Sequence, residues 1–257
     1  MSSNDSIGKT LTVALLLCVV CSVIVSTAAV MLKPAQELNK SLDRKRNILA
    51  AAGMLDETRD VEEQFKQITT RVVDLRNGHF ADDVDAQSID PLKAAKDPAR
   101  SEALSVDEDI AKIFRREHYT RVYIVEDEQG GVDKVILPVR GYGLWSTLYG
   151  FIALESDANT VAGLGFYEHG ETPGLGGEVD NPRWKALWPG KKVYRDDEVA
   201  LQLIKGSVDP DNPNAPWRVD GLAGATLTAR GVTNLVQFWL GENGFAPFLD
   251  NLRAGEA

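Results

Sequence analysis

Residues 220–226, Asp-Gly-Leu-Ala-Gly-Ala-Thr, place a threonine hydroxyl at the end of a turn with almost no side chains. A segment with helical periodicity, Leu227 to Leu240, follows at once. Glycine lets the backbone pass close to a bulky ligand and take positive φ. The start of a helix adds free N–H groups and the positive end of a dipole. The stretch therefore predicts a phosphate-binding turn at which Thr226 holds a phosphate group or is bonded to one.

Short apolar runs upstream of this turn predict two β-hairpins. Arg121 to Val125 pairs with Val132 to Val139 around Gln129-Gly130-Gly131, and Thr147 to Leu154 pairs with Thr160 to Phe166 around Asp157-Ala158-Asn159. A short helix is expected over Asn181 to Leu187, started by Asn181-Pro182, and another strand over Val199 to Ile204. Hairpins mixed with a few helices indicate an α+β fold.

The region before these strands has a different pattern. From Pro34 to about Asp74 apolar residues recur near every 3.6 positions, which predicts a helix. Gly53 should break it, with Asp56 as the cap of the second piece. Residues 82–108 are rich in Asp, Ala, Pro and Ser and predict a loop with short helical turns. We therefore expect a helical stalk and connecting region over 33–110 and a folded domain over 111–257.

The run from Leu11 to Leu32 contains no charge and is bounded by Lys9 and Lys33. As a helix it would span about 33 Å, which matches the hydrocarbon core of a bilayer. The small residues 26–29 resemble a signal-peptide cleavage site, but the apolar part of a signal peptide is shorter, about 7–15 residues. The run therefore predicts an uncleaved single-pass transmembrane helix over 11–32, after a tail of residues 1–10.

Composition excludes several functions. The chain has 257 residues and a net charge of −10, which argues against nucleic acid as a partner. Both cysteines, Cys18 and Cys21, lie inside the apolar run, where they are expected to pack, so the rest of the chain has neither a disulfide framework nor a zinc cluster. Dinucleotide, Walker and hydrolase signatures are absent from the sequence. We expect no metal site and no hydrolytic activity.

Two more glycine-rich stretches precede the turn. Residues 169–177, His-Gly-Glu-Thr-Pro-Gly-Leu-Gly-Gly, form a close-approach loop that either lies against a flat aromatic ring or is a plain surface turn. In it, His169 and Glu171 lack a third metal ligand, so they are more typical of hydrogen-bond partners that anchor a loop. Residues 141–147, Gly-Tyr-Gly-Leu-Trp-Ser-Thr, leave Trp145 as either a core anchor or one wall of a slot for a ring.

Together the three stretches resemble the FMN-binding domain of the C subunits of Na+-translocating NADH:quinone reductases, and the related G subunits of Rnf electron-transport complexes. The stalk start at residues 44–49, Arg-Lys-Arg-Asn-Ile-Leu, adds to the resemblance. The family motif is Asp-x-x-Ser/Thr-Gly-Ala-Thr, and its last threonine is esterified to the FMN phosphate. That residue is Thr226 here. Ala223 occupies the Ser/Thr position, so a hydroxyl is missing there, and Thr228 is the alternative attachment point.

The resemblance implies a covalent flavin electron carrier. A separate flavin transferase would move FMN from FAD to Thr226, with Asp220 orienting or deprotonating the hydroxyl or helping a metal ion of the transferase during attachment. The helix start, with Arg230 or Lys205, would offset the remaining phosphate charge. Leu144, Trp145, Thr172 and Leu175 would form the isoalloxazine pocket. The full set of implied cofactor contacts is Leu144, Trp145, Glu171, Thr172, Gly174, Leu175, Gly176, Lys205, Asp220, Leu222, Gly224 and Ala225.

The resemblance also implies an electron-transfer subunit of a six-subunit Na+-pumping complex in the bacterial inner membrane, with its domain in the periplasm. The charges beside the apolar run favour the opposite orientation, since Lys33, Lys40 and residues 44–46 follow it and only Lys9 precedes it. We follow the family on this point. The alternatives are a flavoprotein of the Rnf type, a colourless tethered assembly domain, and a tethered enzyme that loses non-covalent flavin on denaturation.

Overall fold

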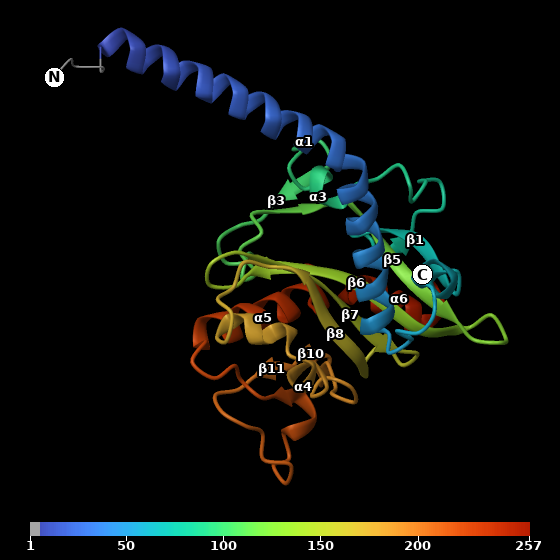
Figure 1. Ribbon diagram of the computed structural model, residues 1–257. Helices are drawn as coiled ribbons and strands as arrows, with labels where there is room; N and C mark the ends of the chain where they lie inside the picture. The colour runs from blue at the N-terminus through green and yellow to red at the C-terminus, as the bar shows by residue number, and fades with distance from the viewer. Residues whose placement is uncertain (1–5) are drawn as a thin grey trace. The chain divides into compact units, whose positions relative to one another are not determined.

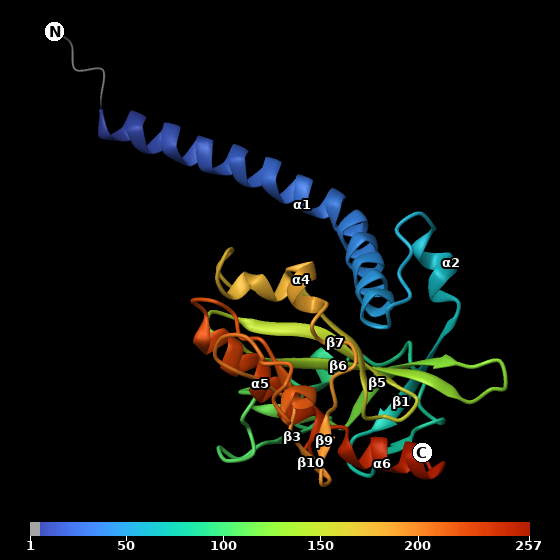
Figure 2. The same cartoon turned by 90° about the horizontal axis from the view of Figure 1, so that it is seen from below.

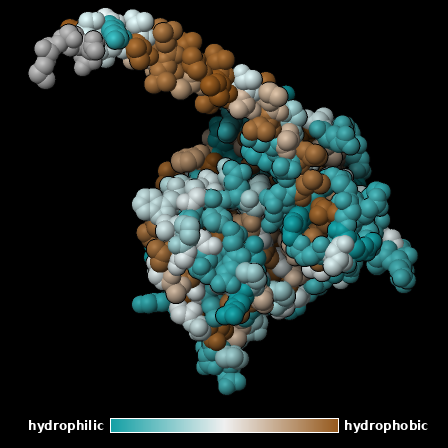
Figure 3. All heavy atoms as spheres, viewed as in Figure 1, coloured by the Kyte–Doolittle hydropathy of each residue, from teal (hydrophilic) through white to brown (hydrophobic). Residues whose placement is uncertain are grey.

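The computed structural model describes residues 6–257, which form two compact units, one ending at Asp43 and the other running from Arg44 to Ala257 (Figure 1). Helix α1 (Ile7–Ala51) provides the first unit and the first residues of the second. Its N-terminal part is exposed and apolar, as the brown surface in Figure 3 shows. By length and composition it is able to cross a membrane, which is compatible with the predicted anchor.

The second unit is built on one antiparallel sheet with the order β2-β1-β5-β6-β7-β8. Its strands are β1 (Ile68–Asp74), β2 (His79–Phe80), β5 (Tyr119–Glu126), β6 (Val132–Tyr142), β7 (Thr147–Glu155) and β8 (Val161–Glu168). Both predicted hairpins are confirmed, because β5 pairs with β6 and β7 with β8. With helices beside the sheet, the fold is α+β, as predicted.

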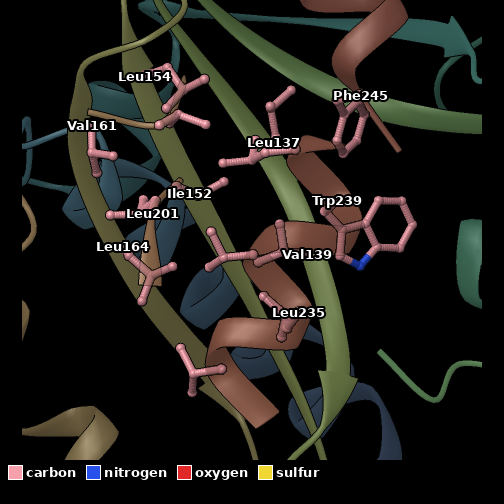
Figure 4. Packing of buried hydrophobic residues seen from close by; sticks show 14 of the residues in the cluster. Leu137, Val139, Ile152, Leu154, Val161, Leu164, Leu201, Leu235, Trp239 and Phe245 are labelled. Carbon is pink, nitrogen blue, oxygen red and sulfur yellow. The ribbon is translucent and has the colours of Figure 1, made fainter. Parts of the chain in front are cut away.

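Both faces of this sheet are buried. On β5, Val122 and Ile124 face one core, whereas Tyr123 and Val125 face the other. The larger core lies between the sheet and helices α5 (Thr226–Leu240) and α6 (Ala246–Ala254), and Figure 4 shows side chains of β6, β7 and β8 meeting those of α5. The smaller core is closed by the last turn of α1, where Ile48 and Leu49 are fully buried. Burial on both faces explains why these strands read as nearly continuous apolar runs.

Short elements connect the sheet to the helices (Figure 2). They are α2 (Val61–Phe65), α3 (Pro91–Ala94), β3 (Ser101–Ala103), β4 (Arg115–Glu117), the 3-10 helices η1 (Gly176–Asp180) and η2 (Ala215–Trp217), α4 (Pro182–Lys185), β9 (Tyr194–Arg195), β10 (Glu198–Val199), β11 (Gln202–Leu203) and β12 (Arg218–Val219). The predicted helix after Asn181 is α4, which Asn181 caps through the N–H of Arg183. The strand expected over 199–204 is instead two short strands, β10 and β11.

The helical pattern predicted up to Asp74 is wrong in its second half. Helix α1 ends at Ala51, before Gly53 at φ +69°, but residues 68–74 are strand β1, paired along their length with β5. Their β-branched residues fit a pleated surface better than a helix. Asp56 is not a cap either: its carboxylate accepts from Thr58, and Asp60 caps α2. The predicted boundary at residue 110, between the connecting region and the FMN-binding domain, stays a prediction. Strands β1 and β2 precede this boundary, but they belong to the same sheet as the strands that follow it.

Candidate functional site

A cleft of about 570 Å³ opens beside the start of α5, a volume typical of small-molecule sites. Among the residues implied as cofactor contacts, it is lined by Lys205, Asp220, Leu222, Gly224 and Thr226. The other lining residues are Gln202, Leu203, Ile204, Gly206, Ser207, Gly221, Ala223, Ala229, Arg230 and Thr233. The structure therefore brings the predicted turn and Lys205 together around one space.

Parallel pairing of β11 and β12 builds this cleft. The register Leu203 to Val219 places the segment after β11 directly beside the predicted turn. The two segments touch through backbone: the N–H of Gly221 donates to the carbonyl of Gly206 at 2.9 Å. A Cβ on Gly221 would lie 2.2 Å from the carbonyl oxygen of Ile204, so only glycine fits there. Gly224 has φ +71°, the left-handed conformation that glycine adopts without strain.

Thr226 is the first residue of α5 and its side chain is exposed. No side chain caps this helix at Ala225, so the N–H groups of its first turn keep their capacity to bind an anion. Lys205 and Arg230 line the same cleft and are exposed; within residues 6–257 neither forms an ion pair. Two cations and a helix start therefore lie around the same space as Thr226, with Asp220 as the acidic residue of the lining.

Asp220 holds the turn through its own hydrogen bonds. Its Oδ1 accepts the N–H of Val208 at 2.8 Å, and its carbonyl oxygen accepts the indole N–H of Trp184 at 3.0 Å. These contacts fix the positions of the Asp220 carboxylate and of its backbone carbonyl at the start of the turn. A direct part for Asp220 in orienting the Thr226 hydroxyl stays a prediction.

The Glu171 carboxylate ties three segments together beside the cleft. Its Oε1 accepts the N–H groups of Leu144 and Trp145, each at 3.0 Å, and that of Ser146 at 3.3 Å. Its Oε2 accepts the hydroxyl of Thr228 at 2.7 Å. Burial raises the pKa of Glu171, but these hydrogen bonds outweigh it and hold the pKa below its ordinary value. The buried carboxylate therefore stays charged and fixes both glycine-rich loops to α5.

These contacts bear on two interpretations that the sequence leaves open. Thr228 is fully buried and bonded to Glu171, whereas Thr226 is exposed and is the one of these two threonines that lines the cleft; which of them carries a cofactor stays a prediction. The interpretation of His169 and Glu171 as hydrogen-bond partners that anchor the loop is confirmed, because His169 also contacts Asp180 through Nε2 at 2.7 Å and accepts the N–H of Glu171. Among the described residues, no group of three His, Cys, Asp or Glu side chains is arranged for a metal ion.

The predicted ring-binding side chains lie in the loops next to the cleft, outside its lining. Trp145 is 66% exposed, which excludes the core-anchor reading, and Leu175 is 45% exposed. Leu175 reaches the turn, since a Cβ on Gly224 would lie 3.0 Å from its Cδ2. Leu144 is half-buried, Thr172 and Gly174 are exposed, and Gly176 and Ala225 are buried. Whether they contact a cofactor stays a prediction.

Sequence reasoning placed only Lys205 on one wall of the cleft and did not reveal a second requirement on two glycines. The strand expected over 199–204 overlaps this wall, but its pairing with β12, which puts residues 202–207 beside the turn, was not predicted. Glu171 requires glycine at positions 143 and 176, because a Cβ on either would lie 2.6 Å from one of its carboxylate oxygens. Only a tertiary contact reveals that requirement.

Comparisons with known proteins agree with this geometry. The model of the FMN-binding domain family matches residues 143–241. The chain is 60% identical to the C subunit of the Na+-translocating NADH-quinone reductase of Pseudomonas aeruginosa, over 100% of both chains. It is 47% identical to the same subunit of Yersinia pestis, over 98% of this chain and 96% of the relative.

Two solved structures are similar as well. Shewanella oneidensis NqrC has a TM-score of 0.73 at 36% identity, covering 82% of this chain and 96% of its own. The C subunit of the Na+-translocating NADH-quinone reductase of Parabacteroides distasonis has a TM-score of 0.64 at 28% identity, covering 85% and 96%.

Proposed function

Since the chain belongs to the family of C subunits of the Na+-translocating NADH-quinone reductase, we propose that it carries FMN bonded to Thr226 through a phosphoester. It is a redox-carrier subunit with an FMN-binding domain. The observation that carries the proposal is the exposed Thr226 hydroxyl at an uncapped helix start, in a cleft that also holds Lys205 and Arg230.

Attachment needs one substitution at phosphorus. Thr226 Oγ forms a bond to the phosphorus of the FMN half of FAD, the hydroxyl proton is lost to a base, and the bond to AMP breaks so that AMP leaves. A separate flavin transferase would bind FAD and perform this step. Asp220, whose carboxylate is held in place by the N–H of Val208, would orient the threonine hydroxyl during this transfer. The product is a phosphodiester with one negative charge.

The residues around Thr226 suit that charge. The N–H groups of the first turn of α5 and the cations Lys205 and Arg230 would offset it. Leu144, Trp145, Thr172 and Leu175 would contact the isoalloxazine, with the exposed indole and isobutyl groups covered by the ring. When bound, the flavin supplies the redox chemistry, and the protein positions it and tunes its electrostatics. A covalent tether prevents dissociation between electron donor and acceptor.

The setting follows from the family and from α1. The chain would be one of six subunits of a complex in the bacterial inner membrane, with α1 crossing the lipid bilayer once and the domain in the periplasm. Sodium movement would be carried out by the complex. Such an arrangement gives this subunit the task of passing electrons between fixed neighbours.

The test is flavin fluorescence in a denaturing gel. The full-length chain, co-expressed with a flavin transferase, should give a fluorescent band that survives denaturation. Thr226→Ala should abolish it, whereas Thr228→Val, which removes a buried hydroxyl, should keep it if the chain remains folded. A wild-type band without fluorescence would mean that the flavin is not covalent. A fluorescent Thr226→Ala band would place the bond at another residue.

A further inference from the structure

The loop between β3 and β4 presents three apolar side chains to solvent, which we call the β3–β4 loop patch. Val106 is 94% exposed, Phe114 is 76% exposed and Ile110 is 40% exposed. Between them, Ala111 is buried and Ile113 packs against the larger core. The same short loop thus buries some apolar side chains and leaves others exposed. The exposed ones forgo the favourable free energy that burial of apolar surface would provide.

Hydrogen bonds fix this loop in place. The Asp109 carboxylate accepts the N–H of Ile113 at 2.8 Å and that of Phe114 at 2.7 Å. The N–H of Leu104 donates to the carbonyl of Phe114 at 3.1 Å, which closes the loop across its base. The exposure of Phe114 is therefore part of an ordered structure.

The backbone also adopts unfavourable angles to hold Phe114 outward. Lys112 has φ 55° and Phe114 has φ 64°, in the left-handed region that bulky residues rarely occupy. Residues held in this way commonly mark functional surfaces, because only the surrounding contacts keep them there. Asp109 supplies those contacts here, by binding the N–H of Phe114 directly.

The patch continues toward the proposed flavin site. The carbonyl of Ala111 accepts the N–H of Tyr142 at 2.8 Å, and Tyr142 is itself 39% exposed. Gly231 of α5 packs on the other side of this segment, since a Cβ there would lie 2.5 Å from the carbonyl oxygen of Tyr142. A protein docked on the patch would therefore reach the segment that leads to Trp145.

Charge around the patch narrows the choice of partner. Asp107 and Glu108 are exposed beside Val106, Asp109 is half-buried, and Lys112 is the cation of the same loop. Anionic lipid would be repelled by such a surface, and a second copy would bring acids against acids. A different protein with an apolar socket and basic residues at its edge satisfies both the apolar and the charged groups.

We propose that the β3–β4 loop patch docks another subunit of the reductase, one that offers an apolar socket with a basic edge. The proposal rests on membership of a multi-subunit complex and is independent of the covalent bond to Thr226. Phe114 would be the main anchor, because exposed aromatic side chains that become buried contribute most to such interfaces. Asp107 and Glu108 would meet the basic edge.

Site-specific photocrosslinking in the assembled complex tests this. p-Benzoylphenylalanine in place of Phe114 should give an adduct with one other reductase subunit, identified by mass spectrometry. The same probe at Gln129, in the exposed turn between β5 and β6, should not. No adduct at position 114, or adducts only with lipid or with a second copy, would overturn the proposal.

Charge reversal at the exposed Asp107 supplies a second measurement and leaves intact the hydrogen bond from the Ser105 N–H to the Glu108 carboxylate. Asp107→Lys should lower the crosslink yield at position 114 by about tenfold, since like charges would then face each other. An unchanged crosslink yield would overturn the proposal that the partner subunit presents basic residues to this side of the patch. In-gel flavin fluorescence should persist in these variants. A wild-type band without fluorescence would count against the covalent flavin and would leave the docking proposal standing.

Discussion

Replacing Glu171 by glutamine should lower the free energy of unfolding by about 2 kcal/mol. The carboxylate accepts three backbone N–H groups and the Thr228 hydroxyl, and it is nearly inaccessible to solvent. Hydrogen bonds to a charged group contribute about 1.5–3 kcal/mol each, against about 0.5–1.5 for neutral ones. Glutamine keeps one oxygen for the three N–H groups and can donate to a rotated Thr228 hydroxyl, so each bond survives in a weaker, neutral form. Because a neutral amide costs less to bury than a carboxylate, the burial term offsets part of this weakening, and a net loss of about 2 kcal/mol is left. Glu171→Ala leaves the N–H groups unpaired and should cost about 4 kcal/mol.

The effect should depend on pH with a defined sign. Burial raises the pKa of Glu171, but hydrogen bonds from Thr228, Trp145 and Leu144 lower it further than burial raises it. The folded pKa therefore lies below the unfolded one. The stabilisation is complete above the unfolded pKa and is lost as the pH falls through the folded pKa. The difference between wild type and Glu171→Gln should be full at about pH 7 and should shrink below about pH 4.5.

Urea unfolding of the full chain in detergent, followed by tryptophan fluorescence, measures these values. Glu168→Gln, an exposed residue three positions earlier, should change the free energy of unfolding by less than about 0.5 kcal/mol. A double-mutant cycle with Thr228→Val should show a coupling of about 1 kcal/mol or more. Additive single effects, or a pH-independent difference between wild type and Glu171→Gln, would refute the role given to the carboxylate.

Three further predictions concern other parts of the domain. Gly221→Ala should nearly abolish flavin loading, because its Cβ would lie 2.2 Å from the Ile204 carbonyl oxygen; wild-type fluorescence in the gel would contradict this. Glu117→Ala should lower the free energy of unfolding by about 3–5 kcal/mol, since it leaves the buried Arg140 guanidinium unpaired; a loss below about 1 kcal/mol in urea unfolding would count against it. Burial raises the pKa of Tyr167 to about 12. The difference in tyrosinate absorbance between the wild type and Tyr167→Phe should therefore titrate near pH 12, and a difference that titrates near pH 10 would contradict this.

Local sequence signals were enough for the hairpins and for α5. The short apolar runs around Gln129-Gly130-Gly131 and Asp157-Ala158-Asn159 became β5 to β8, because glycine and Asx turns set their pairing. Residues 227–240 became α5, which starts one residue earlier, at Thr226. In each case the periodicity and the turn residues agreed with each other.

Elements that depend on distant partners were not predictable in this way. Strand β1 contains Ile68 and Val72, a spacing that also fits a helix, and only pairing with β5 decides the outcome. A strand was expected where β11 lies, but the two-residue β12 is too short for any period, so the parallel pairing of the two that forms one wall of the cleft was not predictable. Helix α6 also escaped prediction, at the end of the chain.

The site shows the same division between local and tertiary information. Thr226 and its glycines were recognised because a turn followed by a helix is a local feature. The function of Glu171 depends on Leu144, Trp145 and Thr228, which are distant in sequence, and no local pattern reveals that it accepts hydrogen bonds from all of them.

The measurement that tests the central claim most directly is the mass of the tryptic peptide between Arg218 and Arg230. This peptide, residues 219–230, contains Thr226 and Thr228. From chain co-expressed with a flavin transferase, its mass should exceed that of the bare peptide by one FMN less one water, and fragmentation should place the addition on Thr226. An unmodified peptide, or an addition on the buried Thr228, would contradict the account.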